Sequence, residues 1–233
     1  NSFSDPATKM DSITLALDTF EFDKVNALTY SVKGQAAELA IDMKGAASLT
    51  VDKEISKVVM GGLNFEANLE GNSLPQSPMK VALNSDLTFD LTNSHLALVL
   101  KKLTANALEF DGKADVTLGD IPKVRFSLHS PNIDLDEFLG LNQGGEKASG
   151  SGEGSTAKGG EQPAKEEVEP DLSALKTLDV KGDIKIDKFK ANNAKMQNVK
   201  ASFSVNRGVA ELTSFTSNLY QGSISASGKL DAR

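Results

Sequence analysis

The sequence predicts a mainly β protein, built as a long, bent antiparallel sheet with one or two short helices. In residues 178–186, Leu178, Val180, Ile184 and Ile186 fall on alternate positions with charged residues between them. This period of two is that of a strand with one apolar face. The longest alternation, 79–91, would span roughly 40 Å at about 3.3 Å per residue. Such length favours an open, groove-like sheet, or an open barrel or sandwich.

The N-terminal strands begin with Ile13, Leu15 and Leu17, which share a parity that changes at Phe20 and Phe22. A parity change within one strand indicates a β-bulge, which bends a sheet. Glycines at 34, 45, 61 and 62 then predict turns. The strands expected between these turns are 25–32, 37–43, 47–51, 55–60 and 63–69.

Two prolines at 75 and 78 make residues 72–78 a loop, because proline cannot donate to a sheet ladder. Ser130-Pro131-Asn132 ends the sheet, and residues 133–139 followed by Gly140 predict a short helix with a glycine cap. The strands expected between the loop and the helix are 79–91, 96–103, 108–118 and 124–128.

A change of composition divides the chain into three parts. Residues 1–140 form an N-terminal sheet region that ends in the short helix. Residues 141–170, rich in Gly, Ser, Glu, Lys and Gln, predict a flexible loop or linker. Residues 171–233 form a second β region, and the sequence leaves open whether it continues the same sheet. Its expected elements are a helical or turn segment at 171–175, strands from 178, at 196–205, 209–215 and 219–230, and a tight turn at 206–208.

The two β regions also resemble one another. Residues 15–20 match 184–189, and 25–39 match 199–212. This weak repeat is typical of a stacked β-array.

Composition excludes several classes of function. A formal net charge of −7 without a basic cluster argues against nucleic-acid binding. The absence of cysteine removes disulfides, thiolate metal sites and thiol nucleophiles. No run approaches the ~20 apolar residues of a membrane-spanning helix. Because the chain begins at Asn1, we expect a piece of a longer protein whose signal peptide or anchor lies outside it.

No pattern of catalytic residues emerges. His95 and His129 lie far apart at strand ends, and we interpret both as surface residues without metal or catalytic partners. Asp134, Asp136 and Glu137 could form a glycosidase carboxylate pair. The simpler interpretation places these acids in the first turn of a helix, where the helix dipole favours negative charge. The glycine-rich stretches lack phosphate-loop spacing. We therefore expect no enzyme activity, cofactor or metal.

The combined apolar face of the strands is the remaining feature. In a closed barrel or sandwich this face would be core, whereas in one bent sheet it would line a groove long enough for acyl chains. Parity within a strand does not decide between the two. The candidate lining residues are Leu83, Leu87, Phe89, Leu98, Phe126, Ile184, Phe203 and Phe215.

Residues 178–233 resemble the C-terminal region of the AsmA family of bacterial envelope proteins. The resemblance rests on the alternation at 178–186, on 199–201 with the turn at 208 and residues 209–212, and on the Leu-Tyr-x-Gly ending at 219–222 followed by Leu-Asp-x-Arg at 230–233. Residues 130–139 are similar to a strand and short helix that precede this region in the family, while the N-terminal strands fit by pattern only.

The resemblance implies a periplasmic body, anchored to the inner membrane by a helix absent from this sequence. It also implies a long β-sheet groove and a role in outer-membrane biogenesis or in moving phospholipid between membranes. It supplies no catalytic residues.

Three functions are therefore weighed. The first is binding or conduction of phospholipid, or another acyl-chain lipid, along the apolar face. The alternative is a scaffold or assembly factor that acts on outer-membrane proteins through free strand edges. The third is a carbohydrate-active enzyme, against which the absence of Trp and the presence of only 2 Tyr count, because sugars stack on aromatic rings.

Overall fold

The computed structural model describes residues 8–141 and 177–231, which form one sheet and one short helix. The elements are β1 (Thr8–Leu17), β2 (Asn26–Ala36), β3 (Leu39–Val51), β4 (Lys57–Glu70), β5 (Met79–Asp90), β6 (His95–Ala105), β7 (Leu108–Thr117), β8 (Lys123–Ser130), β9 (Ile133–Asp134), α1 (Leu135–Phe138), β10 (Asp179–Ala191), β11 (Ala194–Asn206), β12 (Val209–Leu219) and β13 (Gly222–Asp231).

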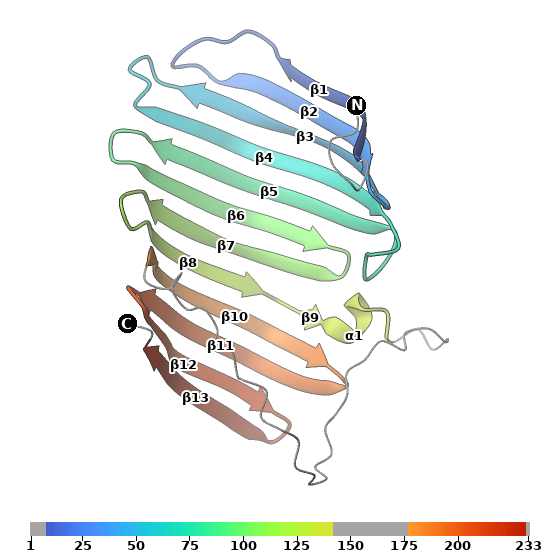
Figure 1. Cartoon of the computed structure of the whole chain (residues 1–233), viewed down its shortest axis with the longest axis vertical. Helices are drawn as coiled ribbons and strands as arrows, with labels where there is room; N and C mark the ends of the chain where they lie inside the picture. Colours follow the sequence, from blue (N-terminus) through green and yellow to red (C-terminus); the bar gives the residue numbers. More distant parts are fainter. Residues whose placement is uncertain (1–7, 142–176, 232–233) are drawn as a thin grey trace, which may run out of the picture.

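The strands follow one another in sequence order, from β1 at one edge to β13 at the other (Figure 1). Neighbours are antiparallel except at β10, which pairs in parallel with β8 and with the short strand β9; Lys123 of β8 lies opposite Asp179 and Ser130 opposite Ile186. The strands before and after residues 142–176 therefore belong to one sheet.

The described residues form an open sheet rather than a closed barrel or sandwich. The only buried hydrophobic residues among them are Ala47, Leu108 and Val199. The largest fully buried side chains are serines, at positions 85, 130 and 217. In a single layer only a small side chain can be covered completely by its neighbours on the same face, whereas a second layer would bury the large ones. The predicted fold class is confirmed.

The register gives the sheet one apolar and one polar face, because directly paired residues lie on the same face. One row of paired residues crosses the sheet from β3 to β13: Leu49, Met60, Leu87, Leu98, Ala114, Phe126, Gly182, Phe203, Leu212 and Gly228. The other face carries cross-strand ion pairs, such as Lys33 with Asp42 at 3.3 Å and Lys102 with Glu109 at 2.9 Å.

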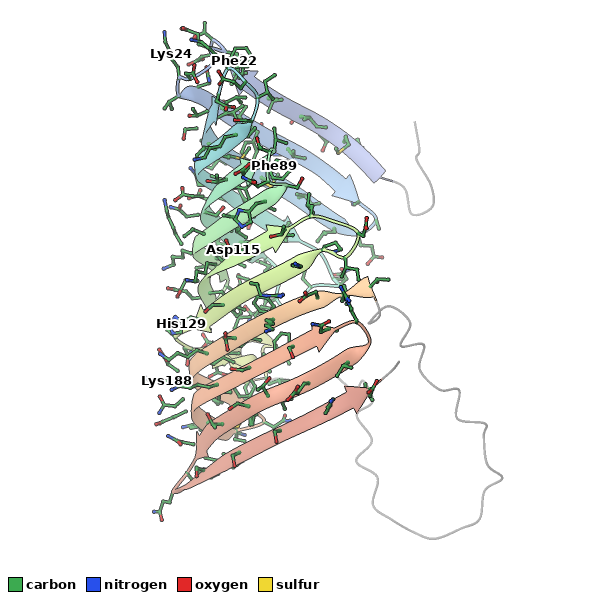
Figure 2. The ribbon with its side chains drawn as sticks, turned by 90° about the vertical axis from the view of Figure 1, so that its left-hand side faces the viewer. Phe22, Lys24, Phe89, Asp115, His129 and Lys188 are labelled. Carbon is green, nitrogen blue, oxygen red and sulfur yellow. The ribbon has the colours of Figure 1, made fainter. Side chains whose placement is uncertain are left out.

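Register shifts bend the sheet. They interrupt the ladders from β3 to β7 and again from β11 to β13. Each shift is a place where one strand carries an extra residue and kinks. In the side view of Figure 2 the strands curve, with His129 and Lys188 at the outer border of the bend and Phe89 within the outline of the ribbon.

Several expected strand boundaries are wrong. Gly34 and Gly45 lie inside β2 and β3, and Gly61-Gly62 forms a register shift inside β4. At Gly45 an added Cβ would lie 2.5 Å from Cζ of Tyr30, so the glycine leaves room for that ring. Leu219 ends β12 and does not begin the last strand.

The bulge expected between Leu17 and Phe20 is also wrong. β1 ends at Leu17, and its register shift lies between Met10 and Ser12. Phe20 and Phe22 therefore belong to the loop that joins β1 to β2.

The repeat does not correspond to a structural repeat. Seven antiparallel steps and one parallel step separate β1 from β10, so the two strands run in opposite directions. Stacked repeats would place matching strands in the same direction.

The short helix is confirmed in position but is shorter than expected. Residues 133–134 form β9, and α1 begins only at Leu135. Gly140 has a φ of 71°, which suits a glycine after a helix end. The linker expected at 141–170, apart from Leu141, and the helical or turn segment expected at 171–175 lie outside the described residues.

Candidate functional site

All eight residues predicted to line a groove lie on the apolar face and are half-buried. Each is paired with apolar residues or glycine on both sides: Leu83 with Phe65 and Leu103, and Leu87 with Met60 and Leu98. The same holds for Phe89, Leu98, Phe126, Ile184, Phe203 and Phe215. The register thus brings together, on one surface, residues of strands from β5 to β12, which are up to seven strands apart in chain order.

Two groups of these residues contact one another. Leu87 and Leu98 are direct partners on β5 and β6. On β8 and β11 the rings of Phe126 and Phe203 meet edge to face, with centroids 5.5 Å apart. Gly182 of β10 lies between them, and an added Cβ there would lie 2.5 Å from Cζ of Phe126. The glycine allows two aromatic rings from non-adjacent strands to touch.

The prediction missed other members of the same surface. Tyr30 of β2, Met60 and Phe65 of β4, Leu96 of β6 and Phe110 of β7 all lie on the apolar face by register. Their signal was the same alternation. The alternation shows which residues of one strand share a face, but only the pairing of the strands shows which faces of different strands form one surface.

On the polar face, His129 bridges two carboxylates. Its Nδ1 lies 2.8 Å from Oδ2 of Asp111 on β7, and its Nε2 lies 3.0 Å from Oδ2 of Asp187 on β10. Hydrogen bonds to Asp111 and then Asp187 raise the pKa of His129. His129 thus has partners that sequence reasoning missed, since they come from two other strands, β7 and β10. They hold β7, β8 and β10 together at the parallel pair.

His95 lies 3.3 Å from Oδ1 of Asp115, on the adjacent strand. In the described part of the chain, no group of three or more His, Cys, Asp or Glu side chains could hold a metal ion.

The acidic residues at α1, Asp134 and Asp136, bind backbone N–H groups that stabilise the fold. Asp134 caps the helix, accepting a hydrogen bond from the backbone N–H of Glu137 at 2.9 Å. Asp136 instead reaches the β10–β11 turn and accepts from the N–H groups of Asn192 at 2.6 Å and Asn193 at 2.9 Å. The Nζ of Lys190 lies 3.1 Å from Asp134 and 3.5 Å from Asp136.

These bonds favour the ionised carboxylates. The N–H of Glu137 is the main cause that lowers the pKa of Asp134, and the N–H of Asn193 the main cause for Asp136. A glycosidase acid needs a raised pKa. The helix-dipole interpretation accounts for Asp134, but Asp136 ties α1 to the sheet.

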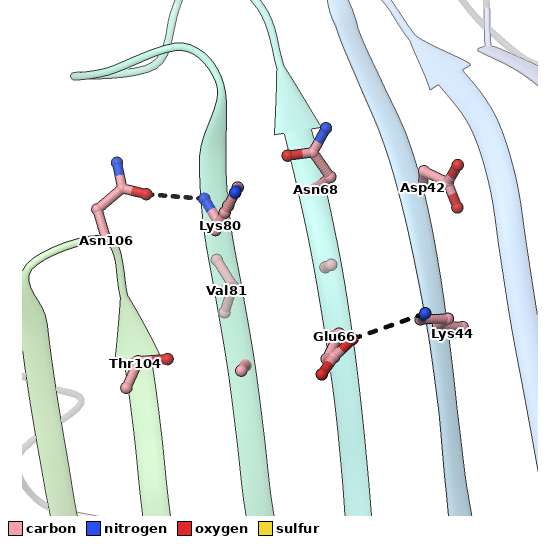
Figure 3. A pocket seen from close by; sticks show the side chains of 10 residues that line it. Asp42, Lys44, Glu66, Asn68, Lys80, Val81, Thr104 and Asn106 are labelled. Carbon is pink, nitrogen blue, oxygen red and sulfur yellow. Dashed lines mark hydrogen bonds and ion pairs between the residues drawn. The ribbon is translucent and has the colours of Figure 1, made fainter.

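A cavity of about 810 Å³ lies on the polar face between β3 and β6 (Figure 3). Lys44 and Glu66, partners on β3 and β4, form an ion pair at one side of it at 3.7 Å, and the backbone N–H of Lys80 donates to Oδ1 of Asn106 at 2.8 Å. None of the eight candidate lining residues borders this cavity. Seven of its ten lining residues are charged or polar, in contrast to the row of paired residues on the apolar face.

Among the described helices, none has the length and apolar character needed to cross a membrane.

Comparison with known proteins places the chain by family. Neither the curated proteins nor the solved structures gave a match. The family model described as AsmA family matches residues 1–233, the whole of the sequence. The match extends the C-terminal resemblance over the N-terminal strands. The chain belongs to the AsmA family.

Proposed function

We propose that this chain is a non-enzymatic part of a bacterial envelope protein that binds phospholipid, or another acyl-chain lipid, along its apolar face and conducts it between inner and outer membranes. Family membership is consistent with a role in envelope biogenesis. The proposed location is the periplasm, with membrane anchorage through parts of the protein outside this sequence.

The observation that supports this proposal is an apolar face without a second described layer. The row from Leu49 to Gly228 crosses the sheet through apolar residues and glycine alone. The eight candidate side chains remain only half-buried. An acyl chain on this face would leave water at about 0.8 kcal/mol per methylene, while its head group stays solvated.

Binding of this kind needs no specific contact. The affinity would come from the area covered, so a chain could move along the row from strand to strand without breaking hydrogen bonds. Conduction along the face, rather than tight retention at one point, follows from that physical basis.

The first experiment is solvent extraction of the purified chain followed by mass spectrometry. Phospholipid should be found at a reproducible ratio above that of a control protein purified in the same way. Lipid at the level of the control protein would count against retention on this face.

A second candidate is a scaffold that assists the assembly of outer-membrane proteins. It is favoured by the position of β13, which is exposed along its length and has one neighbour among the described strands. Such an edge can accept another strand. A protein enriched with the chain by crosslinking to β13, in the absence of bound lipid, would favour this role.

A further inference from the structure

One end of the sheet carries a row of exposed apolar side chains. They lie in the loops that join β1 to β2, β3 to β4, β5 to β6 and β7 to β8, down the left-hand side of Figure 1. We name the following six residues, which are between 39% and 74% exposed, the rim row: Phe20, Phe22, Val25, Ile55, Leu91 and Leu118. At the opposite ends of these strands, the described turns at 37–38, 71–78 and 106–107 hold no exposed large hydrophobic residue, whereas Leu139 and Leu141, after α1, are 49% and 57% exposed.

The first loop is held in a fixed shape by Asn26, a side chain only 3% exposed. Its Oδ1 accepts from the N–H of Glu21 at 2.7 Å, and its Nδ2 donates to the carbonyls of Glu21 at 3.0 Å and Lys24 at 2.9 Å. The loop so fixed presents Phe20 and Phe22 as an edge-to-face pair with centroids 5.1 Å apart. An ordered apolar group loses little freedom on binding.

Neighbouring structure also holds the loops in place. The N–H of Asp23 donates to the carbonyl of Val51 at 2.8 Å, that of Leu91 to Ser56 at 2.8 Å, and that of Leu118 to Ser94 at 2.8 Å. Alternate loops lie about 10 Å apart, because adjacent strands are about 4.8 Å apart. The four loops therefore form a braced line roughly 30 Å long.

Ile55 provides a separate observation. Its φ is 53°, a left-handed conformation that is unfavourable for a β-branched residue. Its side chain is 55% exposed, so packing does not explain why isoleucine occupies this position. Strain of this kind is typical of functional positions.

Five of the eight charged residues in these four loops have hydrogen-bond or ion-pair partners within the chain. Lys24 pairs with Glu21 at 2.5 Å, and Lys53 with Asp23 at 3.5 Å. Asp52 accepts from the N–H groups of Ser56 at 2.7 Å and Lys57 at 2.8 Å. The other three, Asp18, Glu54 and Asp120, have no such partner in the described structure and are exposed beside the apolar side chains of the rim row.

The spacing selects the occupant. A protein interface needs a contiguous, closely packed patch, whereas these tips are separated by gaps of about two strands. A lipid bilayer is fluid and needs no matching pockets, and apolar groups can enter its headgroup boundary to a depth of roughly 5–10 Å. We propose that the rim row inserts into the surface of a bilayer, so that lipid enters the apolar face over this end of the sheet. This inference rests on the proposed lipid-binding function.

The test is flotation of the chain with phosphatidylcholine vesicles at low and high salt. The wild type should float at both salt concentrations, since acidic residues outnumber basic ones in these loops and give no attraction to anionic lipid. Phe20→Ser combined with Phe22→Ser should weaken partitioning about a hundredfold, at roughly tenfold for each phenylalanine.

Two further variants separate binding from folding. Ile55→Asn should weaken partitioning about tenfold while the chain stays folded, because asparagine tolerates a positive φ. Tyr220→Asn is the matched control. It removes a 78% exposed aromatic residue, also at positive φ, from the turn between β12 and β13 at the opposite end, and should float as the wild type does.

The inference is overturned if the wild type does not float, if the double variant floats as well as the wild type, or if flotation requires anionic lipid and disappears at high salt. Self-association that the double variant abolishes, without flotation, would assign the rim row to a protein partner instead. Extraction of bound lipid tests the proposed function separately. If the chain floats with vesicles but no lipid is extracted from it, the proposed lipid-binding function is refuted, while the rim row remains a membrane contact.

Discussion

The substitution Leu87→Asp tests the apolar face at its centre. Leu87 lies between Met60 and Leu98 in the register and is half-buried. Loss of about three methyl or methylene contacts at 0.8 kcal/mol each should weaken lipid retention by about 2 kcal/mol, or roughly thirtyfold. The cost to folding should be only about 1 kcal/mol, half the value of a fully buried leucine, because the new carboxylate stays in water.

The assay measures phospholipid retained per chain and the free energy of unfolding in urea. Asn84→Asp is the matched control: it is nearly isosteric, adds the same charge on the opposite face of β5, and faces Lys102 of β6. It should leave both quantities unchanged. A decrease of about 3–5 kcal/mol in the free energy of unfolding of Leu87→Asp would indicate an unpaired charge in a closed core and would refute the open apolar face. Normal lipid retention would refute the proposed role of this position.

Three further predictions concern stability, each read from urea unfolding. Gly182→Ala should lower the free energy of unfolding by about 1–2 kcal/mol, because the added Cβ would displace the rings of Phe126 and Phe203. Gly228→Ala is the control and should be neutral, because an added Cβ there has nothing within 4 Å. Equal effects of the two substitutions would contradict the role of Gly182 in making room for the two rings. His129 has a raised pKa, so its stabilisation is complete below its unfolded pKa near 6.5 and is lost as pH rises through the higher folded value. The free energy of unfolding of the wild type should therefore fall above about pH 6.5, and that of His129→Gln should not. A parallel fall in both proteins would exclude His129 as the cause. Ser85→Ala should raise the free energy of unfolding by about 1 kcal/mol, since the buried hydroxyl of Ser85 has no hydrogen-bond partner. A lower free energy of unfolding in this variant would indicate that the hydroxyl does have a partner.

The alternation predicted most strands, because in a two-faced sheet the side-chain period is a local property. β5, β6 and β8 lie within a few residues of their expected ranges. Parity also selected eight residues that share one face. The register in which their strands pair could not be predicted from the sequence, since register depends on contacts between segments distant in sequence.

The glycines show where local signals were ambiguous. A glycine between two alternating runs is equally consistent with a turn, a bulge or a close contact. Gly208, with a φ of 91°, is in a turn, but Gly45 lies under the ring of Tyr30 and Gly61-Gly62 shifts the register of β4. Only the neighbouring strand distinguishes these cases. The partners of His129 were equally hidden, because Asp111 and Asp187 reach it from other strands.

Breaks in the alternation have two structural outcomes, and backbone pairing decides between them. Where the neighbouring strand continues, as opposite Gly61-Gly62, the break becomes a register shift and contributes to the bend. Where pairing ends, as after Leu17 and Asp90, the next apolar residue lies beyond the strand end, in one of the loops that carry the rim row. The alternation predicts that Phe20, Ile55 and Leu118 lie in strands, yet all three are exposed in loops. An apolar residue that follows the alternation into a turn is therefore a signal for a contact outside the fold, since burial within the sheet does not account for it.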